Sequence, residues 1–448
     1  MNKQDTLQDI SKKTGNFIRN SATIKVLFIG FLVTVLLVPT FMITSLMTER
    51  ASRRDSVIQE INQKWGNSQT ITGPFFCVPF KSFQTDKNGE SKARIRYMNI
   101  LPERLNISGQ IDPKIRYRSI YEAVLYNIQI NINGNFAIPM LHQSFIPGEN
   151  VLWEKAVFSV GISDMKGIQD NIIIEFNDKK FKANPGLKTT NIASSGIGCI
   201  IPLSSTAKEN SFSLKLNLNG SEQIHFIPVG ETTSVNLKST WPSPSFNGSF
   251  LPTAREITEK GFSADWNILH LNRNFPQFWE GNQYKVSDAY FGLKLLITAD
   301  TYQKTIRISR YALMFIVFTF SAFFLSEIIN KKRVHPIQYI LIGLAIILFY
   351  VLLLSISEHL NFDFAYILSA AAITTIITGY SESILKNNRF TLTVCGILVI
   401  LYAYLYIAIQ LEDYALIMGS IGLLIVLTTV MYITRKIDWY SLGRDQIQ

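Results

Sequence analysis

The sequence carries few charged residues for its length. Asp, Glu, Lys and Arg make up 17% of its 448 residues, against about 25% in ordinary soluble domains, while hydrophobic residues make up 47%. Such a length has room for two or three domains. The net charge of +10 forms no dense basic stripe, and no nucleic-acid-binding motif occurs, so binding to nucleic acid is not expected. Low charge with high hydrophobicity indicates membrane-embedded segments.

Cysteine is also scarce. The sequence has three cysteines and no C-x-x-C pair, which leaves a thioredoxin-like or zinc-ribbon site without support. Cys395 lies within an apolar run and is expected to pack as a small hydrophobic side chain. Cys77 and Cys199 could form one disulfide in an oxidising compartment, but only if their Cα atoms lie close enough, which the sequence leaves open.

Familiar catalytic signatures are missing as well. The nucleophile-elbow, zinc-protease, phosphate-loop and dinucleotide-binding motifs do not occur. His142, His225 and His270 are far apart in sequence, so a metal or triad site would have to assemble in space. Asp164 and Asp265 could act as acid and base, or simply cap turns and helices. We therefore assign no catalytic, cofactor-binding or metal-binding residue, and expect neither an enzyme nor a cofactor.

Long apolar runs with few or no charges are plentiful instead. A bilayer core of about 30 Å requires about 20 apolar residues in a helix. Six stretches reach or approach that length: 26–47, 311–329, 336–357, 364–381, 390–411 and 414–434. The first is too long for the apolar part of a cleaved signal peptide and no small-residue cleavage site follows it, so we predict an uncleaved signal anchor.

The charges between these runs alternate along the chain. Both tails and the loops after the second and fourth runs are basic, whereas the other two short loops carry Glu358, Asp363, Glu412 and Asp413. The positive-inside rule then places both termini in the cytoplasm and residues 48–304 in the periplasm of an inner membrane. The predicted order is a cytoplasmic tail (1–23), transmembrane helix 1 (24–47), a periplasmic stalk helix (48–66), a periplasmic β domain (67–304), five transmembrane helices (305–434) and a cytoplasmic tail (435–448).

Ionisable groups are rare within the predicted membrane helices. Transporters and proton relays usually place such groups at mid-membrane. Glu327 lies near the end of its run, beside the basic cluster that begins at Lys331, and we expect it to pair there. An ion-coupled transporter is therefore disfavoured.

The central segment changes from helical to strand periodicity. Val57, Ile58 and Ile61 recur at helical spacing just after the anchor, which predicts a stalk helix that ends at Gly66. Beyond it, apolar and polar residues alternate in runs separated by turn residues, as in 128–133. We expect a large all-β, sandwich-like domain, single or double, with one helical break near residues 253–260.

Several blocks of the sequence resemble the CreD family of bacterial inner-membrane proteins. The blocks are WGNSQ (65–69), GPFFCVPF (73–80), RSIY (118–121), WPSPSFNGSFLP (241–252), GFSADW (261–266), YALMF (311–315) and TRKIDWY (434–440). The family commonly has Gly where this chain has Ser119. The resemblance implies a cell-envelope integrity protein, linked to a two-component regulon, colicin tolerance and β-lactam stress, with no established enzymatic reaction.

Together these observations favour a non-enzymatic membrane protein whose periplasmic domain binds an envelope component. Besides the lipid bilayer, that partner could be a protein, a lipid or a glycan; the oligomeric state is not predicted. Two alternatives stay open. A transporter or lipid-handling protein would need a deep apolar groove, and a periplasmic hydrolase would need a Ser, His or carboxylate cluster in one cleft.

Overall fold

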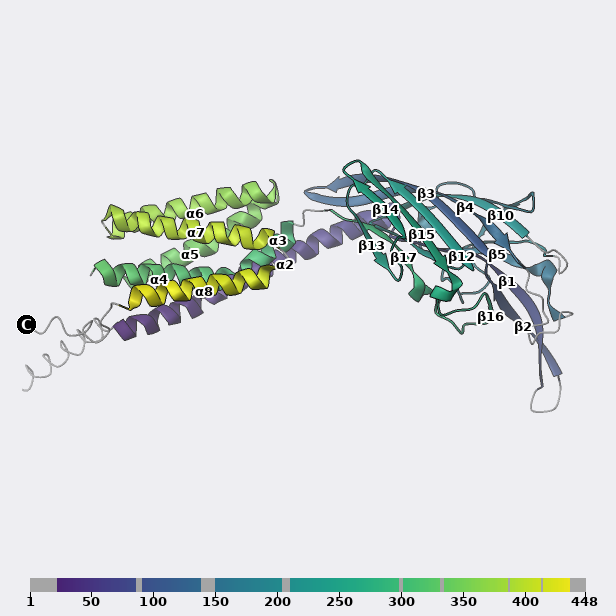
Figure 1. Cartoon of the computed structure of the whole chain (residues 1–448), viewed down its shortest axis with the longest axis horizontal. Helices are drawn as coiled ribbons and strands as arrows, with labels where there is room; N and C mark the ends of the chain where they lie inside the picture. The colour runs from purple at the N-terminus through teal and green to yellow at the C-terminus, as the bar shows by residue number, and fades with distance from the viewer. Residues whose placement is uncertain are drawn as a thin grey trace, which may run out of the picture. The chain divides into compact units, whose positions relative to one another are not determined.

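The computed structural model describes residues 22–85, 91–137, 150–203, 210–297, 301–330, 334–385, 387–411 and 414–435. They form two compact units, one made of residues up to 53 and from 299 onward, the other of residues 54–298. The first unit is helical and the second is a β domain (Figure 1). Helix α2 (Ala22–Trp65) contributes its first part to the helical unit and its last part to the β domain.

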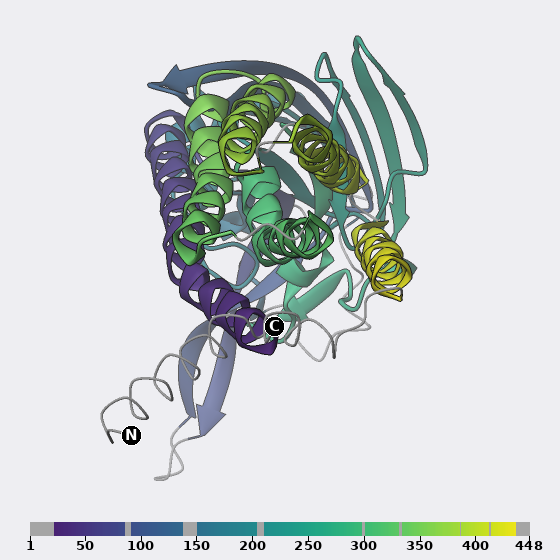
Figure 2. The same ribbon diagram turned by 90° about the vertical axis from the view of Figure 1, so that its left-hand side faces the viewer.

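The helical unit consists mainly of apolar helices, several of which are seen nearly end-on in Figure 2. Besides α2 it contains α3 (Thr301–Ser309), α4 (Ala312–Asn330), α5 (Pro336–Ser357), α6 (Phe362–Leu385), α7 (Asn388–Gln410) and α8 (Ala415–Thr434). Among the described residues, α2, α5, α6 and α7 are each long and apolar enough to cross a membrane. Helices α3 and α4 meet at 46° and would add a fifth span as a bent pair. The sixth predicted span coincides with α8, an apolar helix of 20 residues, and stays a prediction.

Contacts at three positions along the first part of α2 hold it against other helices of its unit. Leu36 packs on Gly343 of α5, where a Cβ would collide with the Leu36 side chain. Farther along α2, the hydroxyls of Thr44 and Ser309 lie 3.3 Å apart. Near the start of α2, Lys25 pairs with the buried Glu327 of α4. Glu327 thus has a partner from far away in sequence. The pairing predicted with the basic cluster at residues 331–333 falls outside the described residues and stays a prediction.

The β domain consists of two mixed sheets. Sheet A has nine strands, with the path β13-β17-β11-β1-β5-β9-β8 and with β2 and β16 attached through β1; sheet B has eight, in the order β14-β15-β12-β3-β4-β10-β6-β7. The strands of sheet A are β1 (Gln69–Thr85), β2 (Ser91–Ile100), β5 (Val157–Ile162), β8 (Asn184–Pro185), β9 (Gly196–Ile200), β11 (Gln223–Ile227), β13 (Pro244–Gly248), β16 (Phe278–Glu280) and β17 (Phe291–Leu295). Those of sheet B are β3 (Arg104–Arg118), β4 (Tyr121–Phe136), β6 (Ile173–Phe176), β7 (Lys179–Lys182), β10 (Asn210–Ser221), β12 (Thr232–Ser239), β14 (Ala254–Thr258) and β15 (Gly261–Leu269).

One hydrophobic core lies between the two sheets. Phe76 of β1 packs edge-on against Phe136 of β4 with ring centroids 4.7 Å apart, and Phe158 of β5 packs on Phe212 of β10 at 5.7 Å. Residues of both sheets belong to the same buried cluster. The predicted sandwich is confirmed, and it is one large sandwich rather than two.

The predicted helical break near residues 253–260 is wrong. Residues Ala254–Thr258 form β14, an edge strand that pairs antiparallel with β15. Their side chains favour a helix locally, but the free edge of β15 supplies backbone partners along the whole segment. The turn into β15 ends at Gly261, whose φ of +135° and close approach to the Ser239 carbonyl exclude a side chain.

Cys77 and Cys199 do not form a disulfide; both are free. They lie on strands either side of β5, where Cys77 is opposite Val157 and Cys199 is opposite Phe158. Consecutive residues of a strand point to opposite faces, so the two thiols face opposite sides of sheet A. Burial raises the pKa of both thiols, to about 11 for Cys199.

The last part of α2 is fixed to the sandwich. The Asn62 side chain donates to the Glu222 carboxylate at 2.8 Å, and the Trp65 indole donates to the Tyr126 carbonyl at 3.2 Å. At Gly66 a Cβ would lie 2.8 Å from the Asn219 carbonyl oxygen. The helix therefore ends at Trp65, in agreement with the predicted stalk. Its end is held by a backbone carbonyl of β4 in sheet B and by the Glu222 side chain at the crossover between the sheets.

Candidate binding cleft

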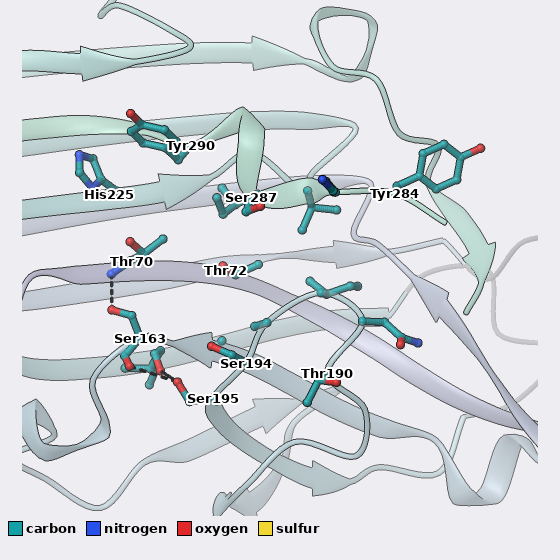
Figure 3. Close-up of a pocket in the computed structure, with 18 of the residues that line it drawn as sticks. Thr70, Thr72, Ser163, Thr190, Ser194, Ser195, His225, Tyr284, Ser287 and Tyr290 are labelled. Atoms are coloured by element: carbon teal, nitrogen blue, oxygen red, sulfur yellow. Dashed lines mark hydrogen bonds between the residues drawn. The ribbon is translucent and has the colours of Figure 1, made fainter. Parts of the chain in front are cut away.

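A cleft of about 600 Å³ lies on the face of sheet A that points away from the core. Its floor is formed by the adjacent strands β11, β1 and β5. On β1, Thr70 and Thr72 flank the core residue Ile71, so their side chains point away from the core into the cleft. Figure 3 shows both threonines at the floor, below the imidazole of His225.

Two segments far apart in sequence form the walls. One is the connection between β8 and β9, residues 190–195; the other is residues 282–290, which include the short 3-10 helix η6 (Val286–Ala289). The first wall approaches the floor closely because β5 has a glycine there. A Cβ on Gly161 would lie 2.5 Å from the Cβ of Ala193, so a larger residue would push the wall outward.

The polar groups that line the cleft are mainly hydroxyls and amides. They belong to Thr70, Thr72, Ser163, Thr190, Asn191, Ser194, Ser195, Asn282, Tyr284, Ser287 and Tyr290. Among the described lining residues Lys285 is the one with a fixed charge, and none is a carboxylate. Apolar surface between them comes from Ile162, Ile192, Ala193, Ile227 and Val286. The cleft therefore combines neutral polar groups with apolar side chains and is almost free of charge.

Several of these groups have no hydrogen-bond partner within the described part of the chain. This holds for the side chains of Thr70, Thr72, Thr190, Asn191 and Asn282. Thr72 is only 5% exposed, so its hydroxyl reaches solvent through the cleft alone. These donors and acceptors are available to a ligand.

Two serines of the cleft are already engaged. Ser163 accepts a hydrogen bond from the Thr70 backbone N–H at 2.8 Å and donates to the Ser68 carbonyl at 3.1 Å. Ser195 donates to the Ile162 carbonyl at 2.6 Å. Both hydroxyls fasten the end of β5 to its neighbours, which leaves neither in the arrangement of an activated nucleophile.

His225 is held by a contact across sheet A. Its Nε2 lies 2.9 Å from Oδ1 of Asn247, which can only accept, so Nε2 carries the proton. Gly292 of β17 lies in register between His225 and Asn247, and it has no side chain that would block their hydrogen bond. The Tyr290 ring packs edge-on against the imidazole, with centroids 4.9 Å apart. Burial lowers the pKa of His225 more than the Asn247 bond raises it, which keeps the ring neutral.

The two aspartates considered for acid–base work are structural. Asp164 caps the 3-10 helix η4 (Met165–Gly167), accepting from the backbone N–H groups of Lys166 and Asn67 at 3.1 and 2.9 Å. Burial acts to raise the pKa of Asp164, but these hydrogen bonds outweigh it and hold that pKa below its usual value. Asp265 lies on β15 of sheet B and accepts from the Asn236 amide at 2.6 Å. The two carboxylates therefore do not form a pair at the cleft.

The histidines do not gather into a site either. Of the three, His225 lines the cleft, whereas His270 lies at the surface with Nδ1 3.8 Å from the Glu231 carboxylate. His142 falls outside the described residues. Within the described residues, no group of three or more His, Cys, Asp and Glu side chains has the geometry of a metal site.

The conspicuous block at residues 241–252 packs against the core through three partly buried aromatic side chains, Trp241, Phe246 and Phe250. Phe246 of β13 packs edge-on against Phe262 and Trp266 of β15, with centroids 6.0 and 5.7 Å apart. Only Asn247 reaches the rim of the cleft, through His225. Sequence reasoning missed the cleft itself, for which the available signal was the run of Thr, Asn and Ser at residues 189–195.

Comparison with known proteins supports the resemblance seen in the sequence. Residues 21–440 match the family described as inner membrane protein CreD. Over 426 residues the chain is 32% identical to the inner membrane protein CreD of Escherichia coli (strain K12), a match that covers 93% of each chain. The chain therefore belongs to the CreD family of inner membrane proteins.

Proposed function

We propose that this protein is a non-enzymatic inner-membrane protein that supports envelope integrity by binding an envelope component in the cleft of its β domain. The observation that carries the proposal is the set of hydroxyl and amide groups at the cleft that have no partner among the described residues. Unpaired polar groups that converge in a concave site are the usual mark of a binding site.

The proposal places residues 48–304 in the periplasm and both termini in the cytoplasm. The support is the alternation of charge along the chain, with basic tails and basic loops on one side of the predicted spans and acidic loops on the other. A periplasmic β domain meets envelope polymers and lipids directly, which fits a role in envelope and β-lactam stress.

The absence of catalysis is part of the proposal. A hydrolase would need a hydroxyl or thiol paired with a base, or an acid and a base facing each other. In the cleft, Ser163 and Ser195 bond to backbone carbonyls and His225 bonds to Asn247. A lipid-handling role would call for an apolar groove, whereas the described lining here mixes hydroxyls and amides with apolar side chains.

A bulky side chain in the cleft tests the proposal. Ser194 is exposed on one wall, so Ser194→Trp fills the cleft without disturbing the core. In cells that lack their own copy, we expect this variant to reach the membrane at the normal level but to fail to restore tolerance of detergent and β-lactam. Asn131→Trp, on the exposed face of β4 in sheet B, is the matched control and should restore it. Full tolerance with Ser194→Trp would refute the proposal.

A further inference from the structure

The chemistry of the cleft also defines the class of its ligand. We propose that the cleft binds a neutral sugar chain, laid along the floor strands β11, β1 and β5. This inference rests on the proposed function, which it narrows from an envelope component to a glycan without a high charge.

The first argument is the match of hydrogen-bonding groups. A hydroxyl both donates and accepts, and an amide side chain offers two donors on its nitrogen and an acceptor oxygen. Thr70, Thr72 and Thr190 supply such hydroxyls, and Asn191 and Asn282 supply amides from opposite walls. A sugar ring presents the same kind of group, a hydroxyl that both donates and accepts, at several neighbouring positions. Each partner can therefore satisfy the other, which a simple anion or cation could not do.

The second argument is charge. Binding of phosphate or carboxylate favours Arg forks or several cations, and binding of a metal cation favours carboxylates. The described lining has Lys285, exposed to solvent, and the neutral His225, with no Arg, Asp or Glu. A strongly charged ligand would lose its hydration here without gaining a fixed counter-charge. A neutral polar ligand incurs no such cost.

The third argument is the placement of two tyrosine rings. Tyr284 and Tyr290 lie at opposite ends of one wall (Figure 3). Each ring is held from one side, Tyr284 by Trp279 at 5.6 Å and Tyr290 by His225 at 4.9 Å between centroids. Fixed aromatic rings with polar tips suit ligands that present both an apolar C–H face and hydroxyls, as sugar rings do. Two such rings along one wall favour a chain of sugars over a single one.

Peptide binding by strand addition is disfavoured by the topology. A peptide that adds to a sheet needs an unpaired strand edge. The floor strands have neighbours on both sides: β11 lies between β17 and β1, and β5 lies between β1 and β9. The cleft therefore offers side chains rather than a free backbone ladder.

The test is a titration of the full chain in lipid nanodiscs. The neutral probes are the trimers of N-acetylglucosamine and of glucose; inorganic phosphate and glycerophosphocholine represent anions and lipid headgroups. Tryptophan fluorescence reports binding, since Trp279 touches Tyr284 at the wall. We expect saturable binding of at least one trimer, weaker binding of the corresponding monosaccharide, and none of the charged probes.

Variants sharpen the result. Tyr290→Ala should weaken trimer binding by about fivefold to tenfold, whereas Tyr290→Phe, which keeps the ring, should bind nearly as wild type. Asn131→Ala on sheet B is the control and should change nothing. If neither trimer binds, or if phosphate or glycerophosphocholine binds in their place, this inference is overturned. The proposed function is refuted by a different result, namely full envelope tolerance in cells that carry Ser194→Trp.

Discussion

The outer faces of the two sheets both carry polar side chains, but within the described part of the chain these side chains are hydrogen-bonded to one another on sheet B and several of them are unpaired on sheet A. On sheet B the amides bond to one another: Asn106 donates to Asn133 at 3.2 Å and Asn127 to Asn217 at 2.8 Å. On sheet A, the hydroxyls of Thr70 and Thr72 have no such partner among the described residues, and neither do the amides of Asn191 and Asn282 in the cleft walls. Polar groups that are paired within the fold contribute to its stability, and those left unpaired at a concave surface are free for a ligand.

We therefore expect different results for the two classes of side chain. Removing a paired group should lower stability and leave ligand binding unchanged. Removing an unpaired group of the cleft should leave stability unchanged and weaken ligand binding. The four predictions below test this division, beginning with the largest effect.

The largest effect is expected at Gln69, which is fully buried. Its amide nitrogen donates to the carbonyls of Asp164 and Asn219 at 2.9 and 3.0 Å. Gln69→Leu removes both of these hydrogen bonds and the one that the Gln69 side-chain oxygen accepts from the Asp164 backbone N–H at 3.2 Å, so the free energy of unfolding should fall by about 2–3 kcal/mol. Chemical denaturation of the full chain measures it. Gln63→Leu, exposed on α2, is the control and should stay within about 0.5 kcal/mol.

A smaller difference should separate two asparagines. Asn236 on sheet B donates to Asp265, whereas Asn191 in the cleft wall has no partner among the described residues. Asn236→Ala should cost about 1 kcal/mol of stability, and Asn191→Ala less than about 0.5 kcal/mol. Trimer binding should respond in the opposite order. Equal losses of stability would show that the division between the two faces is wrong.

Asp164 should contribute a dependence on acid pH. Its pKa is lowered in the folded protein, so the folded state binds fewer protons than the unfolded chain, whose Asp pKa is about 3.9. The stability it contributes is present above that value and is lost as pH falls through the lower folded pKa. Asp164→Asn should therefore destabilise the protein at neutral pH and flatten its acid unfolding curve below about pH 4. A variant curve parallel to the wild-type curve would contradict this.

The smallest effect is expected at His225. Burial lowers its pKa in the folded state below the value of about 6.5 in the unfolded chain. As pH falls below about 6.5, the unfolded chain takes up a proton that the folded protein resists, so stability falls. His225→Gln keeps a donor for Asn247 and removes the titration. Thermal midpoints measured between pH 7 and pH 5, values chosen to bracket that pKa, should then vary less than in the wild type.

Much of the fold could be predicted from local patterns. The alternation of Ile128, Ile130 and Ile132 with polar residues predicted β4 and the face that it buries, and the uncharged runs predicted the apolar helices. The stalk could be predicted because helical spacing continued to Trp65 and a glycine followed. Each of these signals lies within one continuous stretch of chain.

The rest depends on contacts between distant residues. Residues 254–258 form a strand only because β15 offers them an edge, and Glu327 meets Lys25 only because α2 packs beside α4. The cleft joins residues 190–195 to residues 282–290, which are brought together by the order of strands in sheet A. No local pattern encodes that order, so the hydroxyls of Thr70 and Thr72 could not be recognised as a site.

The central claim, that the cleft of sheet A holds an envelope component and the face of sheet B does not, is tested most directly in living cells. A photo-crosslinking amino acid is placed at Thr190 in the cleft wall and, separately, at Asn131 on sheet B, both exposed positions. We predict a light-dependent adduct at residue 190 that Ser194→Trp abolishes and that mass spectrometry identifies as carbohydrate, with none at residue 131. No adduct at residue 190, or equal adducts at both positions, would contradict the account.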